Sequence, residues 1–364
     1  MQITVNREKL NNALRILERI ISKNVSLPIL STVKLKTEKN NVKISATNLE
    51  LGINCWLGAK IAKDGEVAVP ARLFSGLVSN IKDEKISLVT DGNTLKIDSE
   101  DYKTKLLGYS TEDFPIIPKI KKENEVSFNP QELKQSLASV IDSVLPSDTR
   151  PELAGVFINV GDKKIEFAST DSFRLSEKIV DNIEGGSYKG SLILPRQTAV
   201  ELMRIAETYN GKINIVIAEN QIMAYGNDFE LVSRLVDGRY PDYKKIIPDK
   251  IVSLLRLKKG DFERSIRTAG FFSSSIYDIK LKVTNNKTEI IAQNNDKGNM
   301  VASLSSELKN NPFEVTVNYN YLLDGLKNIS TENVIIKHTG DGSPLLMVPD
   351  KEDGFLYLIM PLRS

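Results

Sequence analysis

Alternating hydrophobic and polar residues recur in three similar segments, which begin at Val33, Val156 and Ile279. Each segment reads as a strand, a turn rich in Asn, Asp, Gly or Lys, and a second strand, which is the pattern of a β-hairpin. Successive segments begin 123 residues apart. This regular spacing predicts one structural unit that is used three times along the chain.

Two helices accompany each predicted hairpin. Before the first hairpin, Leu10, Leu14 and Leu17 recur at the spacing of one helix face and would form an apolar stripe. The helices are expected over residues 6–22, 129–144 and 259–270 before the hairpins, and over 69–81, 194–207 and 317–329 after them. The expected helix-start residues are Asn6, Asn129 and Asp261.

The repeated unit predicts an α+β fold in which helices pack on an antiparallel sheet. About 120 residues per unit is a typical size for a domain. Short joints that carry Pro and Lys separate the units, at residues 117–125 and 246–256. We therefore expect three domains, which cover residues 1–120, 121–250 and 251–364.

Composition narrows the class of protein. Of the 364 residues, 41% are hydrophobic and 26% are charged, as in ordinary soluble proteins. The chain has one cysteine and no apolar run of membrane-spanning or signal-peptide type, so we expect a cytoplasmic protein without a membrane partner. His338 is the sole histidine, and no Walker A or GxGxxG loop is present. We therefore expect no catalytic residue, no metal and no cofactor.

Cationic residues follow the predicted helices in all three units, although the net charge is only +2. On the first helix they recur every three or four residues, opposite the apolar stripe. Such cations are either a solvated helix face or a surface that contacts phosphate groups, and their similar placement in three units favours the second interpretation. The residues predicted to face such phosphate groups, as those of DNA, are Arg15, Arg19, Lys23, Arg72, Lys134, Arg196, Arg204 and Arg264.

A chain of three such units leaves an unpaired sheet edge at each end, and exposed edges are normally paired or blocked. Head-to-tail pairing between two copies would cover both edges and would close into a ring of six units. The sequence supplies the identical modules and short joints that such a ring requires, and it leaves closure itself open.

Several motifs occur in the order that is typical of one known family. They are SLPIL at 26–30, VPARLF at 69–74, DFP at 113–115, VDGRYPDY at 236–243 and MPLR at 360–363. Together with the three repeats, they resemble the bacterial DNA polymerase III beta subunit, the sliding clamp, over the whole chain. The resemblance implies three sliding-clamp domains in a head-to-tail homodimeric ring around duplex DNA, which tethers the replicative polymerase and has no catalytic activity of its own.

The same resemblance implies the partners and two further sites. The partners would be double-stranded DNA of any sequence, a second copy of the chain, the DNA polymerase III alpha subunit, the clamp loader, and other replication and repair proteins that carry a clamp-binding peptide. The peptide-binding cleft would comprise Leu153, Thr170, Ser172, Phe173, Arg174, Leu175, Pro241, Ile246, Leu358, Met360, Pro361, Leu362 and Arg363. The dimer interface would comprise Leu73, Phe74, Thr104, Arg267, Gly270, Phe271 and Phe272.

The cleft departs from the usual family pattern at Ser172 and Phe173, and also at its end, where Arg363-Ser364 replaces an apolar last residue. Ser172 replaces a glycine, which restricts the backbone because a positive φ is costly without glycine. Phe173 replaces a histidine and adds apolar area, so the bound peptide would make a larger hydrophobic contact. Phe271 and Phe272 suit either an apolar interface or burial within their own domain.

Two other functions are compatible with the residues. A hydrolase would use Asp171 with Ser172 or Thr170, or the carboxylates of Asp237 and Asp242, but no histidine lies nearby to act as a base. A ring of the same shape could also bind something other than DNA. Cationic helix faces that point outward would favour that alternative.

Overall fold

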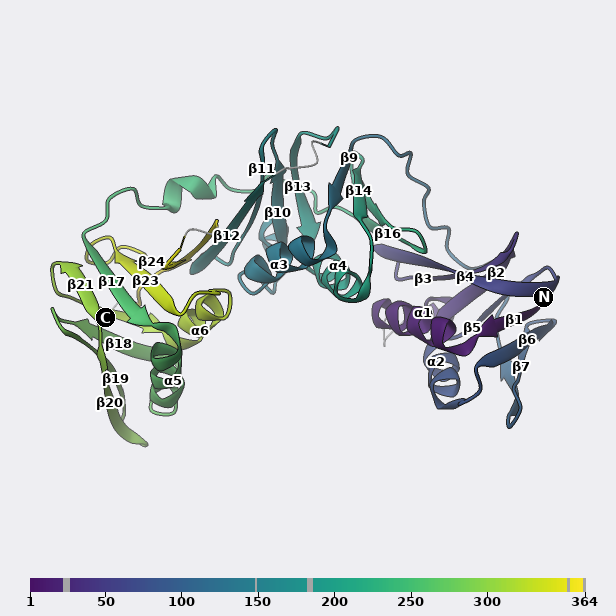
Figure 1. Cartoon of the computed structure of the whole chain (residues 1–364), viewed down its shortest axis with the longest axis horizontal. Coiled ribbons are helices and arrows are strands. Elements are labelled where there is room, and N and C mark those ends of the chain that lie inside the picture. Colours follow the sequence, from purple (N-terminus) through teal and green to yellow (C-terminus); the bar gives the residue numbers. More distant parts are fainter. Residues whose placement is uncertain (22–26, 148, 182–185, 352–353, 363–364) are drawn as a thin grey trace. The chain divides into compact units, whose positions relative to one another are not determined.

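The computed structural model describes residues 1–21, 27–147, 149–181, 186–351 and 354–362. These residues form two compact units. Figure 1 labels the helices and strands and colours them by sequence. Unit 1 comprises Met1–Pro130, Gly186–Tyr188 and Ile205–Leu235, and unit 2 comprises Gln131–Gly185, Lys189–Arg204 and Val236–Ser364. The predicted central domain therefore contributes residues to both units.

The three predicted hairpins are present and share one register. In these hairpins Lys34 pairs with Ser45, Phe157 with Ala168, and Lys280 with Ile291, so the repeat of 123 residues holds for individual strand pairs. Their strands are β2 (Thr32–Glu38) and β3 (Asn41–Thr47), β10 (Gly155–Val160) and β11 (Lys164–Thr170), and β18 (Asp278–Val283) and β19 (Lys287–Asn294).

Each predicted helix is also present. They are α1 (Arg7–Ile20), α2 (Ala71–Asn80), α3 (Pro130–Ile141), α4 (Arg196–Thr208), α5 (Lys259–Gly270) and α6 (Tyr319–Lys327). Asn6 caps α1, because its side chain accepts a hydrogen bond from the N–H of Lys9 at 3.0 Å. The prediction that Asp261 starts a helix was wrong: α5 begins at Lys259, directly after a strand, and Asp261 lies in its first turn.

One sheet of twelve strands runs through unit 1. Its main path is β8-β7-β6-β1-β4-β16-β15-β14-β9, and β2, β3 and β5 branch from it. The strand β16 pairs with β4, so residues 229–234 extend a sheet that begins in the first predicted domain. The further strands are β1 (Gln2–Asn6), β4 (Leu51–Lys63), β5 (Glu66–Pro70), β6 (Lys85–Asp91), β7 (Thr94–Asp98), β8 (Lys103–Leu107), β9 (Glu125–Phe128), β14 (Ile213–Ile217), β15 (Gln221–Tyr225) and β16 (Phe229–Arg234).

Unit 2 contains a sheet of nine strands and a sheet of four. The orders are β13-β10-β11-β12-β25-β24-β23-β17-β21 and β20-β19-β18-β22. The pairing of β12 with β25 joins residues 174–178 to the C-terminal strand. The further strands are β12 (Arg174–Asp181), β13 (Gly190–Pro195), β17 (Ser253–Lys258), β20 (Gly298–Ser305), β21 (Glu307–Asn310), β22 (Phe313–Asn318), β23 (Asn333–His338), β24 (Leu345–Pro349) and β25 (Phe355–Ile359).

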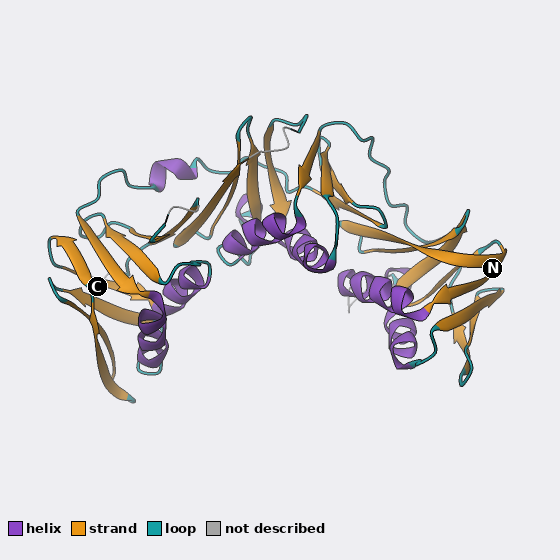
Figure 2. Ribbon diagram, viewed as in Figure 1, coloured by secondary structure: helices purple, strands orange, loops and turns teal. Residues whose placement is uncertain are grey.

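In unit 1, α1 and α2 lie side by side against the sheet, and in unit 2, α5 and α6 do the same (Figure 2). Leu10, Leu14 and Leu17 of α1 are buried, as are Phe262 and Ile266 of α5. Each such side chain contributes about 1.5–3 kcal/mol when it is removed from water. The opposite faces of these helices are therefore left to polar residues. No helix among the described residues has the length and apolar character that a membrane span requires.

Candidate nucleic-acid interface and peptide-binding surface

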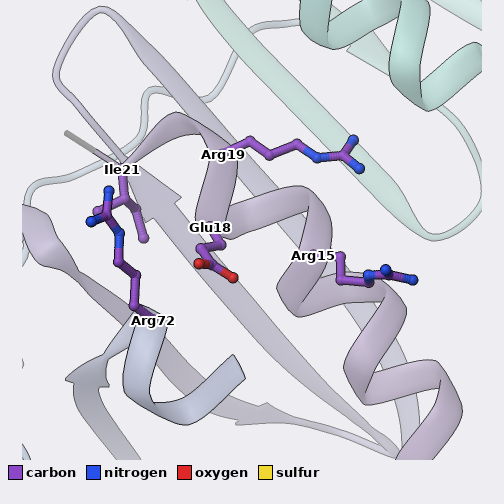
Figure 3. A pocket seen from close by; sticks show the side chains of 5 residues that line it. All are labelled: Arg15, Glu18, Arg19, Ile21 and Arg72. Carbon is purple, nitrogen blue, oxygen red and sulfur yellow. The ribbon is translucent and has the colours of Figure 1, made fainter. Parts of the chain in front are cut away.

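Three of the predicted DNA-facing arginines gather in unit 1. Arg15 and Arg19 of α1 and Arg72 of α2 line one hollow of about 580 Å³, together with Glu18 and Ile21. Figure 3 shows Arg15 and Arg19 extending from the same side of α1, with Glu18 between them and Arg72. Within the described part of the chain, no hydrogen bond or ion pair joins any of these arginines to another side chain. The hollow therefore presents three guanidinium groups and one carboxylate.

The other predicted DNA-facing residues differ in how they are engaged. Arg196 is exposed at the start of α4. Arg204 is paired with Glu201, with 2.5 Å between Nη1 and Oε1, and Arg264 is paired with Asp261. Lys134 is half-buried on α3. Lys23 lies outside the described residues.

The helices α5 and α6 of unit 2 form a second hollow, of about 490 Å³. Lys259, Arg267 and Lys327 line it. Arg267 pairs with Glu263 at 2.7 Å, and Lys327 pairs with Asp142 at 2.8 Å. Unlike the arginines of unit 1, these two cations are each paired with a carboxylate of their own unit.

The turn at Thr170–Arg174 belongs to the predicted peptide-binding cleft and is held by its own side chains. The hydroxyl of Thr170 donates to the carbonyl of Arg174 at 2.7 Å and accepts from the N–H of Ser172 at 3.2 Å. The carboxylate of Asp171 accepts from the N–H groups of Phe173 and Arg174, at 2.9 and 3.0 Å. These bonds hold Ser172 at a φ of 79°, a conformation that normally favours glycine.

Arg174 is locked in place beneath this turn. Its side chain is only 13% exposed, and it pairs with Asp171, with 3.0 Å between Nε and Oδ2, and with Asp324. Its guanidinium also lies over the ring of Tyr321, 4.5 Å from the centroid. Burial alone would lower the pKa of Arg174, but the hydroxyl of Tyr357 and the two carboxylates raise it above its usual value. Arg174 is therefore a positioning residue. The exposed Arg150 is a cation beside the turn, and it donates to the Ser172 hydroxyl and to the Glu152 carboxylate, both at 3.1 Å.

An apolar cluster lies next to the turn and contains three of the predicted cleft residues. Leu153, Leu175 and Leu358 are buried in it, together with Tyr240 and Tyr243. Thr170 in the turn is buried as well. Six further predicted members lie at the surface or are half-buried. They are Phe173, which is 59% exposed, the exposed Pro241, Ile246 and Met360, and the half-buried Pro361 and Leu362. Arg363 lies outside the described residues.

Two tyrosines that the sequence did not single out fix the segment after Val236. Tyr240 stacks on Phe157 with 4.9 Å between ring centroids, and Tyr243 meets Phe157 edge-on. The hydroxyl of Tyr243 donates to Glu177 at 2.7 Å. Burial, and then the Glu177 carboxylate, raise the pKa of Tyr243 above its usual value. The two tyrosines of the YPDY motif, three residues apart, are the sequence pattern that could have predicted this packing.

The predicted interface residues divide into exposed and buried ones. Leu73 is 54% exposed and Phe271 is 73% exposed, whereas Phe74 is fully buried and Phe272 packs on the core of unit 2. Thr104 lies on β8, an end strand of the unit 1 sheet, and β20 is an end strand in unit 2. Gly270 lies so close to the ring of Tyr319 that a Cβ atom would approach it to 2.8 Å.

The side chains of the alternative hydrolase are engaged in other contacts. Both carboxylate oxygens of Asp171 hold the turn and Arg174. His338 is buried and stacks on Phe313 with 4.3 Å between ring centroids. Asp242 pairs with Lys245 at 3.0 Å, and Asp237 is exposed.

Comparisons with known proteins agree with this architecture. Family models described as the N-terminal, central and C-terminal domains of the DNA polymerase III beta subunit match residues 1–118, 127–242 and 244–363. The Beta sliding clamps of Staphylococcus epidermidis and Staphylococcus aureus are 26% and 25% identical to the chain, and each alignment covers 100% of both proteins.

Solved structures resemble the fold closely. The DNA polymerase III subunit beta from Pseudomonas aeruginosa matches with a TM-score of 0.95 and 24% identity, over 100% of both chains. The DNA polymerase sliding clamp from Bacillus subtilis matches with a TM-score of 0.96 and 21% identity, over 100% of this chain and 99% of the other.

The chain belongs to the DNA polymerase III beta subunit family, the DNA sliding clamps. It has the three clamp domains and the mixed helix-and-sheet fold of that family. Its function is that of a processivity factor, which encircles duplex DNA as a ring and tethers the replicative polymerase.

Proposed function

We propose that this clamp holds duplex DNA by enclosure and by weak phosphate contacts, for which Arg15, Arg19 and Arg72 are available. The observation that carries this proposal is that all three arginines line one hollow and have no described ionic partner. Contacts with phosphate carry no sequence information and weaken with salt. A closed ring does not need tight adhesion, so loose contacts of this kind permit movement along the duplex.

The ring is a head-to-tail homodimer in this proposal. The end strand β8 carries Thr104, and Leu73 and Phe271 are apolar side chains that water would otherwise surround. Phe74, Phe272 and Gly270 support these surfaces from within each unit. The clamp is cytoplasmic and opens one interface for a clamp loader, which supplies the ATP hydrolysis.

Partner proteins, including the DNA polymerase III alpha subunit, dock by an extended peptide on the surface beside the turn at Thr170–Arg174. Phe173, Ile246 and Met360 supply exposed apolar contacts around the buried cluster. Arg150 is the cation that an acidic group of the peptide would meet. The clamp has no catalytic role of its own, in keeping with the use of both Asp171 oxygens in the turn.

A primer-extension assay tests the proposal. The assay contains a long primed template, the polymerase, the clamp loader, ATP and this chain. We expect the chain to lengthen the product of each polymerase binding event by more than tenfold. A chain that ends at Ile359 keeps β25 but lacks Met360, and should lose most of this effect while remaining dimeric. Products of equal length with the full chain, with the chain that ends at Ile359 and with no clamp would contradict the proposed function.

Salt dependence tests the arginines separately. Replacing Arg15, Arg19 and Arg72 by Ala should reduce the slope of log affinity for duplex DNA against log salt by about 2–3, because each lost phosphate contact contributes about 0.9. The control is Lys163→Ala, which removes an exposed cation from the turn between β10 and β11 and should leave the slope unchanged. An equal slope in the triple variant and the unmodified protein would exclude these arginines from the DNA contact.

A further inference from the structure

Unit 1 contains a hollow of about 270 Å³ that none of the functions above uses. It is bordered by the turn that begins at Thr47, by the joint Pro115–Pro118, and by the ends of β15 and β16. Leu49, Ile116, Ile117 and Val232 give it apolar walls. A volume of this size accommodates one or two aliphatic side chains of a ligand.

The turn that borders the hollow has the same backbone geometry as the turn of the proposed peptide-binding surface, which lies 123 residues later in the chain. The Thr47 hydroxyl donates to the carbonyl of Leu51 at 3.1 Å and accepts from the N–H of Leu49 at 3.1 Å. The Asn48 side chain accepts from the N–H groups of Glu50 and Leu51, at 3.1 and 2.8 Å. Leu49 has a φ of 78°, which nearly equals the 79° of Ser172.

The strand that completes each site also attaches in the same way. The N–H of Arg234 donates to the carbonyl of Glu50 at 3.0 Å, and the N–H of Met360 donates to the carbonyl of Phe173 at 2.8 Å. The preceding pairs correspond as well, because Ser233 lies opposite Leu51 and Ile359 lies opposite Arg174. Arg234 thus occupies the position of Met360, and Glu50 that of Phe173.

The joints that follow each repeat supply the third wall. Ile117 presses on the backbone of Gly52, where a Cβ atom would lie only 2.9 Å from its side chain. Ile116 is 92% exposed beside it, although it is a large aliphatic residue. The corresponding joint of the proposed peptide surface also carries two isoleucines before a proline, at 246–248.

The rim of the hollow carries a weak ion pair. The guanidinium of Arg234 lies 3.5 Å from a carboxylate oxygen of Glu50, and both side chains are about two-thirds exposed. Exposed pairs of this kind contribute little energy, so a ligand carboxylate could replace Glu50 at small cost. Apolar walls and an exchangeable arginine together fit a ligand that has an aliphatic side chain next to a carboxylate.

We propose that this hollow binds a short extended peptide, with an aliphatic side chain between Ile116, Ile117 and Val232 and a neighbouring carboxylate on Arg234. The clamp would then offer partner proteins a second docking point. This proposal rests on the proposed peptide docking at the turn Thr170–Arg174, since it assigns the same ligand class to the equivalent site.

The experiment is a titration of the methyl-labelled, full-length dimer with acetyl-Leu-Asp-Leu-Ala-amide. Methyl signals of Ile117 and Val232 report on the hollow, and those of Ile246 and Met360 report on the proposed peptide surface. We expect both sets to respond. Ile116→Glu and Arg234→Glu should each weaken binding at the hollow at least tenfold and leave the signals of Ile246 and Met360 unaffected. Ile276→Glu, at another exposed isoleucine, is the matched control.

The two sets of signals separate the possible failures. If Ile117 and Val232 do not respond at peptide concentrations that saturate Ile246, the second docking point is wrong and the proposed function stands. A response at Ile117 alone would support the hollow and overturn the peptide surface at Thr170–Arg174. If neither set responds up to millimolar peptide, or if Ile116→Glu has no effect at the hollow, the proposal is overturned.

Discussion

The turn at Thr47–Leu51 and the turn at Thr170–Arg174 have nearly the same backbone and carry different side chains. In both, a threonine hydroxyl and an Asx side chain accept or donate the same set of hydrogen bonds. The positions that face outward differ, with Leu49 and Glu50 in the first turn and Ser172 and Phe173 in the second. The comparison teaches that local hydrogen bonds fix the turn, whereas the side chains around it decide what it binds.

The largest expected difference between the turns lies in their stability. Asp171→Ala removes two hydrogen bonds to the backbone and leaves Arg174, which is largely buried, with Asp324 as its remaining carboxylate, so it should cost about 2–4 kcal/mol in the free energy of unfolding. Asn48→Ala removes only the backbone bonds and should cost about 0.5–1.5 kcal/mol. Urea denaturation of both variants measures these values. Equal costs would show that Arg174 does not depend on Asp171.

Exchanging the outward side chains tests their role in binding. Phe173→Glu combined with Met360→Arg gives the second site the charges of the first, and should weaken peptide binding there about tenfold, or ~1.4 kcal/mol. Glu50→Phe alone, which keeps Arg234 for the ligand carboxylate, should strengthen binding at the hollow. Phe173, Met360 and Glu50 are all exposed, so the fold should be retained. Isothermal titration calorimetry measures both effects, and unchanged affinity in both variants would contradict the comparison.

The smallest expected effect concerns pH and the segment that leads into the joint beside each turn. Glu66 accepts a hydrogen bond from Thr111 at 2.6 Å, and this bond, against burial, holds the pKa of Glu66 below its usual value. The stability that this carboxylate adds is present above its unfolded pKa and is lost as the pH falls through the folded pKa. Glu66→Gln should therefore lower stability by less than about 1 kcal/mol near neutral pH and make little difference in acid.

The second joint offers the matching measurement. Burial would raise the pKa of Glu166, but Asn159 and Lys244 bond to it and keep the pKa below its usual value. Glu166→Gln should show the same direction of pH dependence in thermal unfolding. If the difference in stability between the unmodified protein and either Gln variant instead grew as the pH fell, the predicted direction of the pH dependence would be contradicted.

Much of the fold could be predicted from the sequence because its signals are local. The apolar stripe of Leu10, Leu14 and Leu17 predicts α1, and alternation predicts the hairpins with their spacing of 123 residues. The start of α5 could not be predicted from a capping residue, because the strand β17 leads directly into the helix at Lys259. The three domain boundaries stay predictions.

The candidate site depends more on contacts between distant residues. Arg174 meets Asp324, which lies 150 residues later, and this contact turns a predicted ligand-binding cation into a buried support. The pairings of β16 with β4 and of β12 with β25 join residues of different predicted domains, and no local pattern specifies such partners. The hollow beside Gly52 arises from one of these pairings and was likewise absent from the sequence analysis.

Retention on DNA circles tests the central claim most directly. The clamp is loaded by the clamp loader onto a nicked circular duplex, free protein is removed, and a restriction enzyme then cuts half of the sample. The account predicts that the clamp stays on intact circles at moderate salt and escapes from the cut molecules over their ends. Equal rates of loss from intact and cut DNA would contradict the claim that this protein holds DNA by enclosure.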